Sequence, residues 1–332
     1  MLKEKSVDII RASEIEPKEV RWLWYPYIPY GKVTLIQGDP GDGKSTFVLN
    51  LAALLTTDKP LPFTEEAREP VTVIYQNSED DADDTVLPRF IKAGGDVNRL
   101  VFINEAEHPL TFSDERLYNA VVQENAKLLI LDPLSSYIGG NVSLNMSNEV
   151  RPQFNSLIRI AKKLDCAVIV VAHMNKAQGL KALYRTTGSI DIVAAARSSL
   201  LIARTSSDIS DNERIMAVQK NNLASMGKSV LFSVGEGVVE WLDQVDRSAD
   251  EILGNCAVNG RPDDRLKEAK DFIQSMLENG PLPAVECESR LKTAGIRKTT
   301  AKKAKKELGV ISEKEGAVWF WKLRRRQQVN KY

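Results

Sequence analysis

Short apolar runs alternate with longer amphipathic stretches over the first three quarters of the chain. Runs such as Leu128–Asp132 and Ala167–Ala172 are apolar at nearly every position, which is typical of strands buried on both faces of a parallel sheet. The pattern predicts strands at Val33–Gln37, Val71–Gln76, Leu100–Ile103, Leu128–Asp132, Ala167–Ala172, Ser199–Ala203, Ile215–Gln219 and Val230–Ser233. Helices are predicted between the earlier strands, at Lys44–Leu55, Asp81–Ala93, Asp114–Glu124 and Glu149–Leu164. We therefore expect an α/β fold with a mainly parallel sheet, extended by antiparallel strands where the helices stop.

Changes in composition divide the chain into four regions. Residues 1–30 are predicted as a lead-in with an aromatic cluster, and residues 31–242 hold the alternating strands and helices. Residues 243–262 are polar and contain glycine and proline, which predicts a linker. Residues 263–332 contain three helical stretches and two short strands, at Asp263–Leu277, Val285–Leu291, Lys298–Leu308, Val310-Ile311 and Val318–Trp321. Three helices followed by a hairpin predict a small winged-helix-like domain.

Overall composition narrows the class of protein. The 332 residues suit about two domains, and 43% hydrophobic with 27% charged residues is ordinary for a globular protein. No apolar run approaches the ~20 residues that cross a bilayer, and no signal peptide is visible at the N-terminus. Three scattered cysteines and two histidines offer no pattern for a disulfide framework or a zinc site. We expect a cytoplasmic protein without a membrane partner.

The zero net charge is unevenly distributed. Residues 261–332 carry 18 Lys and Arg against 10 Asp and Glu, whereas residues 1–260 carry 27 against 35. Because attraction to a polyanion depends on local Lys and Arg rather than on net charge, we expect DNA to contact the C-terminal segment.

The strongest motif lies between the first predicted strand and the first predicted helix. Residues 38–45 read Gly-Asp-Pro-Gly-Asp-Gly-Lys-Ser and fit the phosphate-binding loop, or P-loop, G-x-x-x-x-G-K-[ST]. Glycines let backbone N–H groups turn toward phosphates, and the N-terminus of the next helix favours negative charge. Lys44 would neutralise the β- and γ-phosphates, and Ser45 would bind Mg²⁺. The predicted nucleotide-binding residues are Gly38, Asp39, Pro40, Gly41, Asp42, Gly43, Lys44, Ser45 and Thr46.

Carboxylates at the ends of two other strands complete the predicted chemistry. Asp132 ends an apolar strand after the P-loop, so Ser45 and Asp132 are the predicted ligands of Mg²⁺. Pro133 follows where many AAA+ ATPases place a glutamate, so another carboxylate must orient the attacking water. Glu79 is the candidate and Asp80 the alternative, although an acidic run here would also stabilise the start of the next helix.

The base of the nucleotide is predicted from residues 175–178. They read Asn-Lys-Ala-Gln and nearly match the guanine-binding Asn-Lys-x-Asp. Because a glutamine replaces the aspartate that reads guanine, we expect ATP rather than GTP.

Several motifs occur in an order that resembles one ATPase family. They are Ile28–Lys32, Gly38–Thr46, Ser78–Asp80, Leu131–Pro133, Ala172–Lys176, Ala194–Ser198 and Lys220–Ala224. Together they resemble the RecA-like ATPases of the RepA-type replicative helicase family, found on plasmids, phages and other mobile elements. The resemblance covers about residues 15–240. It implies a RecA-like P-loop core, ATP hydrolysis, helicase activity on DNA, and a homo-oligomeric ring, usually a hexamer, with ATP between subunits.

The resemblance also implies roles for single residues. Glu79 would be the catalytic carboxylate, and His173 at the end of the strand 167–172 would sense the γ-phosphate, a satisfied buried histidine being the alternative. Lys220 would reach the ATP of a neighbouring subunit. Related helicases have Lys-x-Arg there, but this chain has asparagine in place of the arginine, so Arg197 and Arg204 remain alternatives.

Two kinds of segment are predicted to touch DNA. Within residues 297–326, one helix and the segment after the hairpin are rich in basic residues, at Lys302, Lys303, Lys305, Lys306 and Arg324-Arg325-Arg326. Core loops at residues 139–145 and 178–187 are further candidates. A solvated or protein-binding basic helix, and ordinary flexible loops, are the alternatives.

Three functions are compatible with these features. An ATP-driven DNA motor of the replicative helicase type is preferred. A DNA-binding ATPase that does not unwind DNA, such as a regulator or loader whose oligomerisation ATP controls, is the second. The third is a signalling ATPase of the circadian-clock type with protein partners, which the basic C-terminal segment disfavours.

Overall fold

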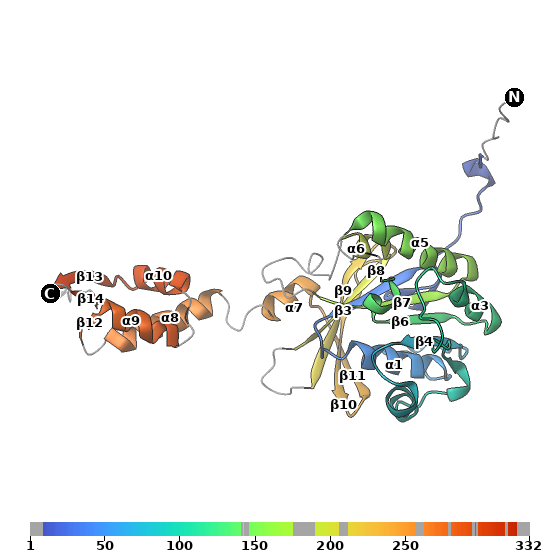
Figure 1. Ribbon diagram of the computed structural model, residues 1–332, viewed down its shortest axis with the longest axis horizontal. Coiled ribbons are helices and arrows are strands. Elements are labelled where there is room, and N and C mark those ends of the chain that lie inside the picture. The colour runs from blue at the N-terminus through green and yellow to red at the C-terminus, as the bar shows by residue number, and fades with distance from the viewer. Residues whose placement is uncertain are drawn as a thin grey trace. The chain divides into compact units, whose positions relative to one another are not determined.

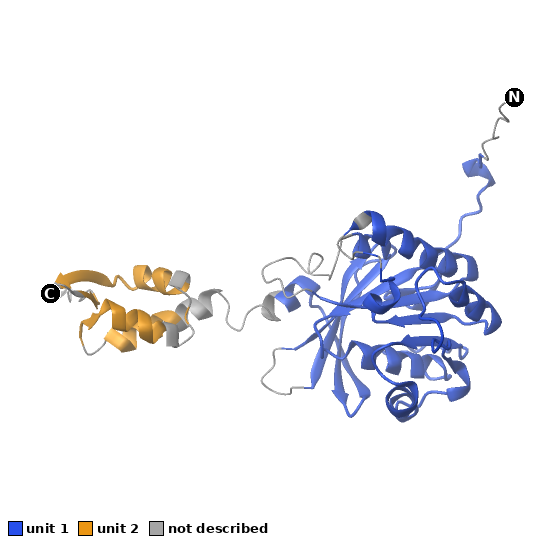
Figure 2. Ribbon diagram, viewed as in Figure 1, with its two compact units in different colours: residues 1–256 blue, residues 257–332 orange. Residues whose placement is uncertain are grey.

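The computed structural model describes two compact units, residues 1–256 and 257–332 (Figure 2). The described residues are 9–140, 142, 146–174, 190–205, 212–256, 262–277, 280–293, 296, 298–315 and 318–323. Each unit has its own hydrophobic core, so each is described by itself. Among the described residues, no helix combines the length and the apolar character needed to cross a membrane.

A nine-stranded sheet forms the centre of the first unit, in the order β11-β10-β9-β8-β3-β7-β6-β4-β5 (Figure 1). Its strands are β3 (Val33–Gly38), β4 (Val73–Asn77), β5 (Leu100–Val101), β6 (Leu128–Asp132), β7 (Ala167–His173), β8 (Ser198–Arg204), β9 (Glu213–Asn221), β10 (Ser229–Gly235) and β11 (Val238–Val245). Strands β5, β4, β6, β7, β3 and β8 pair in parallel, and β9, β10 and β11 continue the sheet in antiparallel pairs. The predicted α/β fold with a mainly parallel sheet is confirmed.

Helices cover both faces of this sheet (Figure 1). The helices of the first unit are α1 (Lys44–Leu55), α2 (Leu87–Lys92), α3 (Glu115–Gln123), α4 (Leu134–Tyr137), α5 (Ser147–Leu164), α6 (Ile190–Ala195) and α7 (Ala249–Cys256), with the short helices η2 (Ala82–Val86) and η3 (Val97–Arg99). The short helix η1 (Ala12–Glu14) buries none of its residues and is not part of these layers. Ile36 and Ile130 pack with α1 on one face, whereas Leu35 and Leu129 pack with α3 and α5 on the other. Adjacent strand residues point to opposite faces, which is why these strands are apolar at every position.

Part of the predicted lead-in belongs to the core. Strands β1 (Trp22–Trp24) and β2 (Ile28–Pro29) form a small antiparallel hairpin. Trp24 and Tyr27 are buried, and the Trp24 ring packs against Phe47 of α1 and Trp241 of β11. Aromatic contacts with distant residues, rather than local pattern, therefore place this hairpin in the first unit.

The predicted linker 243–262 is shorter in the structure. Residues 243–245 end β11, and α7 packs Ile252 and Leu253 against β8 and β9. Two adjacent apolar residues in a polar stretch carry little periodic signal, so only packing reveals this helix.

Within its described residues, the second unit combines three helices with a three-stranded sheet. Its elements are α8 (Pro262–Leu277), β12 (Leu282–Pro283), α9 (Ala284–Thr293), α10 (Lys298–Glu307), β13 (Ile311–Glu315) and β14 (Val318–Lys322). The strands pair antiparallel in the order β12-β14-β13. Ile273, Leu291, Ala304 and Trp321 are among the residues of its core. Strand β12 is an addition to the predicted elements: it pairs with β14 through only two residues, too few for a pattern.

Candidate nucleotide-binding site

The P-loop connects β3 to α1 at the carboxyl edge of the parallel strands. Gly41 and Gly43 have φ angles of +80° and +85°, in the left-handed region that favours glycine. Gly38 is also required sterically, because a Cβ there would lie 2.1 Å from the carbonyl oxygen of Ile202 on β8. The glycine pattern of the motif therefore follows from backbone conformation and from the close approach of β8.

Lys44 begins α1 and is 4% exposed. Its Nζ donates to the carbonyl oxygens of Gly38 and Asp39, at 3.1 and 2.9 Å. Burial lowers the pKa of Lys44, while nearby carboxylates, Asp42 and Asp132 foremost, act in the opposite direction. The ammonium group therefore lies against the loop that would surround the phosphates.

Asp42 and Arg204 hold the P-loop in shape. The Asp42 Oδ2 atom accepts the backbone N–H of Asp39 at 2.9 Å, and burial raises the pKa of Asp42. Arg204, at the end of β8, donates to the Gly41 carbonyl at 3.1 Å, with its Nε 3.6 Å from Asp42 Oδ1. Arg204 therefore contacts the P-loop of its own chain, and its action on a neighbouring subunit stays a prediction.

Ser45 and Asp132 lie together at the start of α1 and the end of β6. Asp132 is 2% exposed, and burial raises its pKa to about 6. Hydrogen bonds from Ser45 and Tyr75 oppose that rise, whereas the charge of Glu79 adds to it. A buried carboxylate with an adjacent hydroxyl is a hard oxygen donor pair, so these residues fit Mg²⁺, which prefers such ligands together with phosphate and water.

Glu79 and Asp80 follow β4 and face different partners. The Glu79 Oε1 atom lies 3.7 Å from Nε2 of His173, the last residue of β7, and the Glu79 side chain is 57% exposed. Asp80 Oδ2 instead pairs with Arg89 of α2 at 3.2 Å. Glu79 is therefore the carboxylate that faces the P-loop side of the sheet, and Asp80 is occupied elsewhere.

His173 lies beside Glu79 at the carboxyl edge. Its Nδ1 atom is buried and has no hydrogen-bond partner within the described part of the chain. His173 also pairs with Gly38 in the β3–β7 register, so the end of β7 lies next to the first residue of the P-loop.

Lys220 and Arg197 lie toward the other end of β3. Lys220 pairs with Ser199, which pairs with Leu35 of β3, three residues before the P-loop begins. The Lys220 ammonium donates to the carbonyls of Val193 and Ala196 at 2.8 Å, at the C-terminal end of α6, and burial lowers its pKa. Arg197 is exposed at the same end of the sheet. Action of Lys220 on a neighbour's nucleotide stays a prediction, and it requires release from these carbonyls.

Two residues that link Asp132 to the backbone of Glu79 are not evident from the sequence. Tyr75 and Asn77 lie on β4, where they read only as members of an apolar strand and of its end. Their one sequence signal is the spacing of Asn77 and Glu79, since asparagine often accepts the N–H of the residue two positions later.

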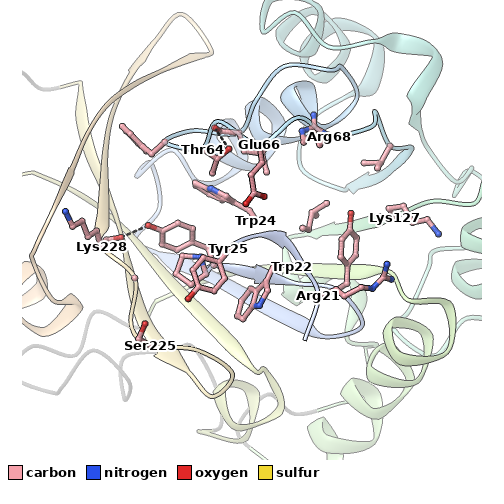
Figure 3. Close-up of a pocket in the computed structure, with 18 of the residues that line it drawn as sticks. Arg21, Trp22, Trp24, Tyr25, Thr64, Glu66, Arg68, Lys127, Ser225 and Lys228 are labelled. Atoms are coloured by element: carbon pink, nitrogen blue, oxygen red, sulfur yellow. Dashed lines mark hydrogen bonds between the residues drawn. The ribbon is translucent and has the colours of Figure 1, made fainter. Parts of the chain in front are cut away.

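A separate cavity of about 740 Å³ lies at the amino edge of the sheet (Figure 3). It is lined by aromatic and charged residues that include Trp22, Trp24, Tyr25, Arg68 and Lys127. Lys127 immediately precedes β6, so the cavity and the P-loop lie at opposite edges. Its Arg68 donates to the carbonyl of Thr57 at 2.7 Å, just after α1.

Strand order and P-loop together give the molecule the fold of a RecA-like P-loop protein. The P-loop strand β3 lies between β7 and β8, and β7 separates it from β6 with its terminal aspartate. The family model described as AAA domain matches residues 1–179, which is more than half of the chain. The chain belongs to this family.

Two curated relatives are similar over part of their length. The DNA repair protein RadA of Bacillus subtilis (strain 168) is 26% identical over 149 residues, 44% of this chain and 28% of that protein. The DNA repair protein RadA of Halalkalibacterium halodurans is 24% identical over 216 residues, 63% of this chain and 40% of that protein. The chain thus spans less than half of each relative.

Two solved structures align with part of this chain. The RadB recombinase aligns with a TM-score of 0.47 and 15% identity, over 65% of this chain and 93% of that one. A KaiC-like protein from Pyrococcus horikoshii OT3 aligns with a TM-score of 0.48 and 17% identity, over 67% and 96%.

Proposed function

We propose that this protein hydrolyses ATP with Mg²⁺ and uses the energy to act on DNA as a RepA-type replicative helicase. The proposal depends on one observation: Lys44, Asp132, Glu79 and His173 come from four separate elements and meet at one edge of the sheet. The carboxyl edge of a parallel sheet is where such folds bind ligands. The names of the RadA relatives support an association with DNA.

Each residue has a distinct part in the proposed reaction. Lys44 leaves the carbonyls of the P-loop and binds the β- and γ-phosphate oxygens. Ser45 and Asp132 hold Mg²⁺, which neutralises phosphate charge when bound. Glu79 orients the attacking water, and His173 donates a hydrogen bond to the γ-phosphate.

The second unit supplies the proposed contact with DNA. We propose that it is a winged-helix domain that places α10 against the DNA backbone. Lys302, Lys303 and Lys306 of α10 are exposed and can reach phosphates. Lys305 cannot do so equally, because its Nζ lies 3.9 Å from the centre of the Trp321 ring and donates to Ser312 at 2.6 Å. The predicted DNA contacts at Arg324-Arg325-Arg326, at residues 178–187 and at most of 139–145 lie outside the described residues.

A strand-displacement assay tests the proposed function. The full chain is mixed with a forked DNA and ATP, and the Lys44→Ala variant serves as the control with weakened ATP binding. Release of the strand by the wild type alone supports the helicase. ATP-dependent assembly and DNA binding without strand release would instead favour the regulator or loader, and ATP turnover that DNA leaves unchanged would contradict both.

A further inference from the structure

A chain of hydrogen bonds joins the Asp132 carboxylate to the backbone of Glu79. Asn77, the last residue of β4, accepts the backbone N–H of Glu79 at 2.7 Å and that of Asp80 at 3.0 Å, both at Oδ1. Because Oδ1 serves as the acceptor, the other end of the amide must be the donor. The Asn77 Nδ2 atom accordingly donates to the hydroxyl of Tyr75 at 3.1 Å.

Tyr75 continues the chain to the strand next to it. The Tyr75 hydroxyl accepts from Asn77, so its own proton can point to Asp132 Oδ2, 3.3 Å away. Tyr75 is 1% exposed, so this contact is shielded from solvent. The β4–β6 register supports the geometry, because Asn77 pairs with Asp132 and the N–H of Ser78 donates to the Asp132 carbonyl at 3.2 Å.

Without such a connection, the position of Glu79 would be poorly defined. Its side chain is 57% exposed and carries the same charge as Asp132, and Glu79 lies two residues beyond the end of β4. Like charges repel and a glutamate has several rotatable bonds, so a fixed backbone at Glu79 limits the positions that its carboxylate can take.

We propose that Tyr75 and Asn77 are positioning residues that set Asp132 and Glu79 at a fixed spacing, so that one holds Mg²⁺ while the other orients water. Tyr75 acts on the metal-binding carboxylate, and Asn77 acts on the backbone of Glu79. This inference depends on the proposed function, because it assigns the pair to ATP hydrolysis at the same site.

Three substitutions separate these effects. Tyr75→Phe removes only the hydroxyl, so we expect the Mg²⁺ concentration for half-maximal ATP binding to rise by about 10-fold, as outer-shell changes at metal sites typically do. ATP binding without Mg²⁺ should remain at the wild-type level. Asn77→Ala frees the backbone of Glu79, and we expect kcat to fall by about 10-fold with KM nearly unchanged. Asn77→Asp keeps both acceptor contacts, so it should recover part of that kcat.

Tyr27→Phe is the matched control for a buried tyrosine. Tyr27 is also 1% exposed, and its hydroxyl donates to the Lys228 carbonyl at 2.8 Å, beside the cavity at the amino edge. A fluorescent ATP analogue titrated with Mg²⁺ measures binding, steady-state turnover measures kcat, and thermal melting compares folding of all variants.

The outcomes distinguish the inference from the function. If Tyr75→Phe requires more Mg²⁺ than Tyr27→Phe at equal Tm, the positioning role is supported. If wild type hydrolyses ATP and the two variants have the same Mg²⁺ requirement, the inference is wrong and the proposed function stands. If the wild type shows no Mg²⁺-dependent binding of the ATP analogue, both the inference and the proposed function are wrong. Equal losses of kcat in Asn77→Ala and Asn77→Asp would overturn the role of Asn77.

Discussion

At the scale of single residues, neighbouring carboxylates differ in their contacts. Glu79 faces His173, whereas Asp80 is paired with Arg89. From the sequence, either residue could orient water, because a run of acidic residues does not reveal where each side chain points. The fold separates them, since β7 supplies a partner for one and α2 a partner for the other.

A pair of amide substitutions tests this distinction. We expect Glu79→Gln to retain ATP binding and to lower kcat by about 100-fold or more, the usual contribution of a positioned acid or base. Asp80→Asn removes a partly exposed ion pair, so kcat should change by no more than about twofold. Single-turnover hydrolysis measured beside ATP affinity checks both, and normal kcat in Glu79→Gln would exclude Glu79 as the essential carboxylate.

The role of Lys44 in phosphate binding is tested through ATP affinity rather than through kcat. Lys44→Ala removes a charge-assisted contact with phosphate, so ATP affinity should fall by roughly 10-fold or more, given about 1.5–3 kcal/mol for hydrogen bonds to charged groups. Isothermal calorimetry with ATP and Mg²⁺ measures the change. Unaltered affinity would show that the P-loop lysine does not contact bound nucleotide.

Burial of Asp132 sets Mg²⁺ binding, which needs the ionised carboxylate, against the stability of the folded protein. Its pKa is raised from 3.8 to about 6, so the folded state favours the protonated form. Ionisation of the buried group therefore destabilises the protein as pH rises through this range, by about 3 kcal/mol at most for a shift of this size. Without nucleotide, Asp132→Asn should be more stable than wild type at pH 7.5, and the gain should vanish near pH 4.

Urea unfolding at the two pH values measures that gain. The matched comparison is Asp114→Asn, because hydrogen bonds and charge from Arg116 lower the pKa of Asp114 and the pH dependence must have the opposite sign. A gain for Asp132→Asn that is equal at both pH values would show that charge is not its cause.

At the scale of elements, α10 shows how packing selects among similar residues. Periodicity on a helix groups several lysines, yet the cation of Lys305 lies over Trp321, whereas Lys302, Lys303 and Lys306 are exposed. The triple substitution of these three by Ala should weaken DNA binding for unrelated sequences. It should also flatten the log–log dependence on salt by about 0.9 for each duplex phosphate that a lysine no longer neutralises.

Lys305→Ala is the control within the same helix. It removes a cation–π contact worth about 0.5–1 kcal/mol, so it should lower the stability of the second unit while the salt slope stays unchanged. Fluorescence anisotropy over a range of salt concentrations measures both variants. If the triple variant binds with the slope of the wild type, α10 does not lie on the DNA backbone.

At the scale of the whole molecule, Lys220 tests whether subunits complete each other's sites. Lys220 lies away from the P-loop of its own chain, so we expect it to act on the ATP that a second copy binds. Specific ATPase activity should then rise with protein concentration, and mixed Lys44→Ala and Lys220→Ala chains should regain part of the activity. Analytical ultracentrifugation run in parallel identifies the active species, and full activity in a monomer would contradict the prediction.

The loss of Lys220 also affects α6 directly. Its ammonium binds carbonyls at the end of that helix, where a cation is worth about 0.3–1 kcal/mol. Thermal melting therefore accompanies the mixing experiment. Lys220→Arg keeps a cation at this end of α6 and serves as the second variant.

Elements that have a local cause can be predicted from the amino-acid sequence alone. Apolar runs such as Leu128–Asp132 predict strands covered on both faces, and the glycines of residues 38–43 predict the loop conformation, because backbone sterics and burial act residue by residue. The α/β fold and the placement of Lys44 at the start of a helix followed from these signals. Roles for Glu79, His173 and Lys220 remain predictions.

Contacts between side chains from different elements depend on how the elements pack together. The Tyr75 hydroxyl reaches Asp132 because β4 lies next to β6, although the two residues are more than fifty positions apart in the chain. Arg204 reaches Gly41 because β8 pairs with β3. Strand order in a sheet depends on the free energy of the whole packed molecule. The pattern of apolar and polar residues along the chain does not specify that order.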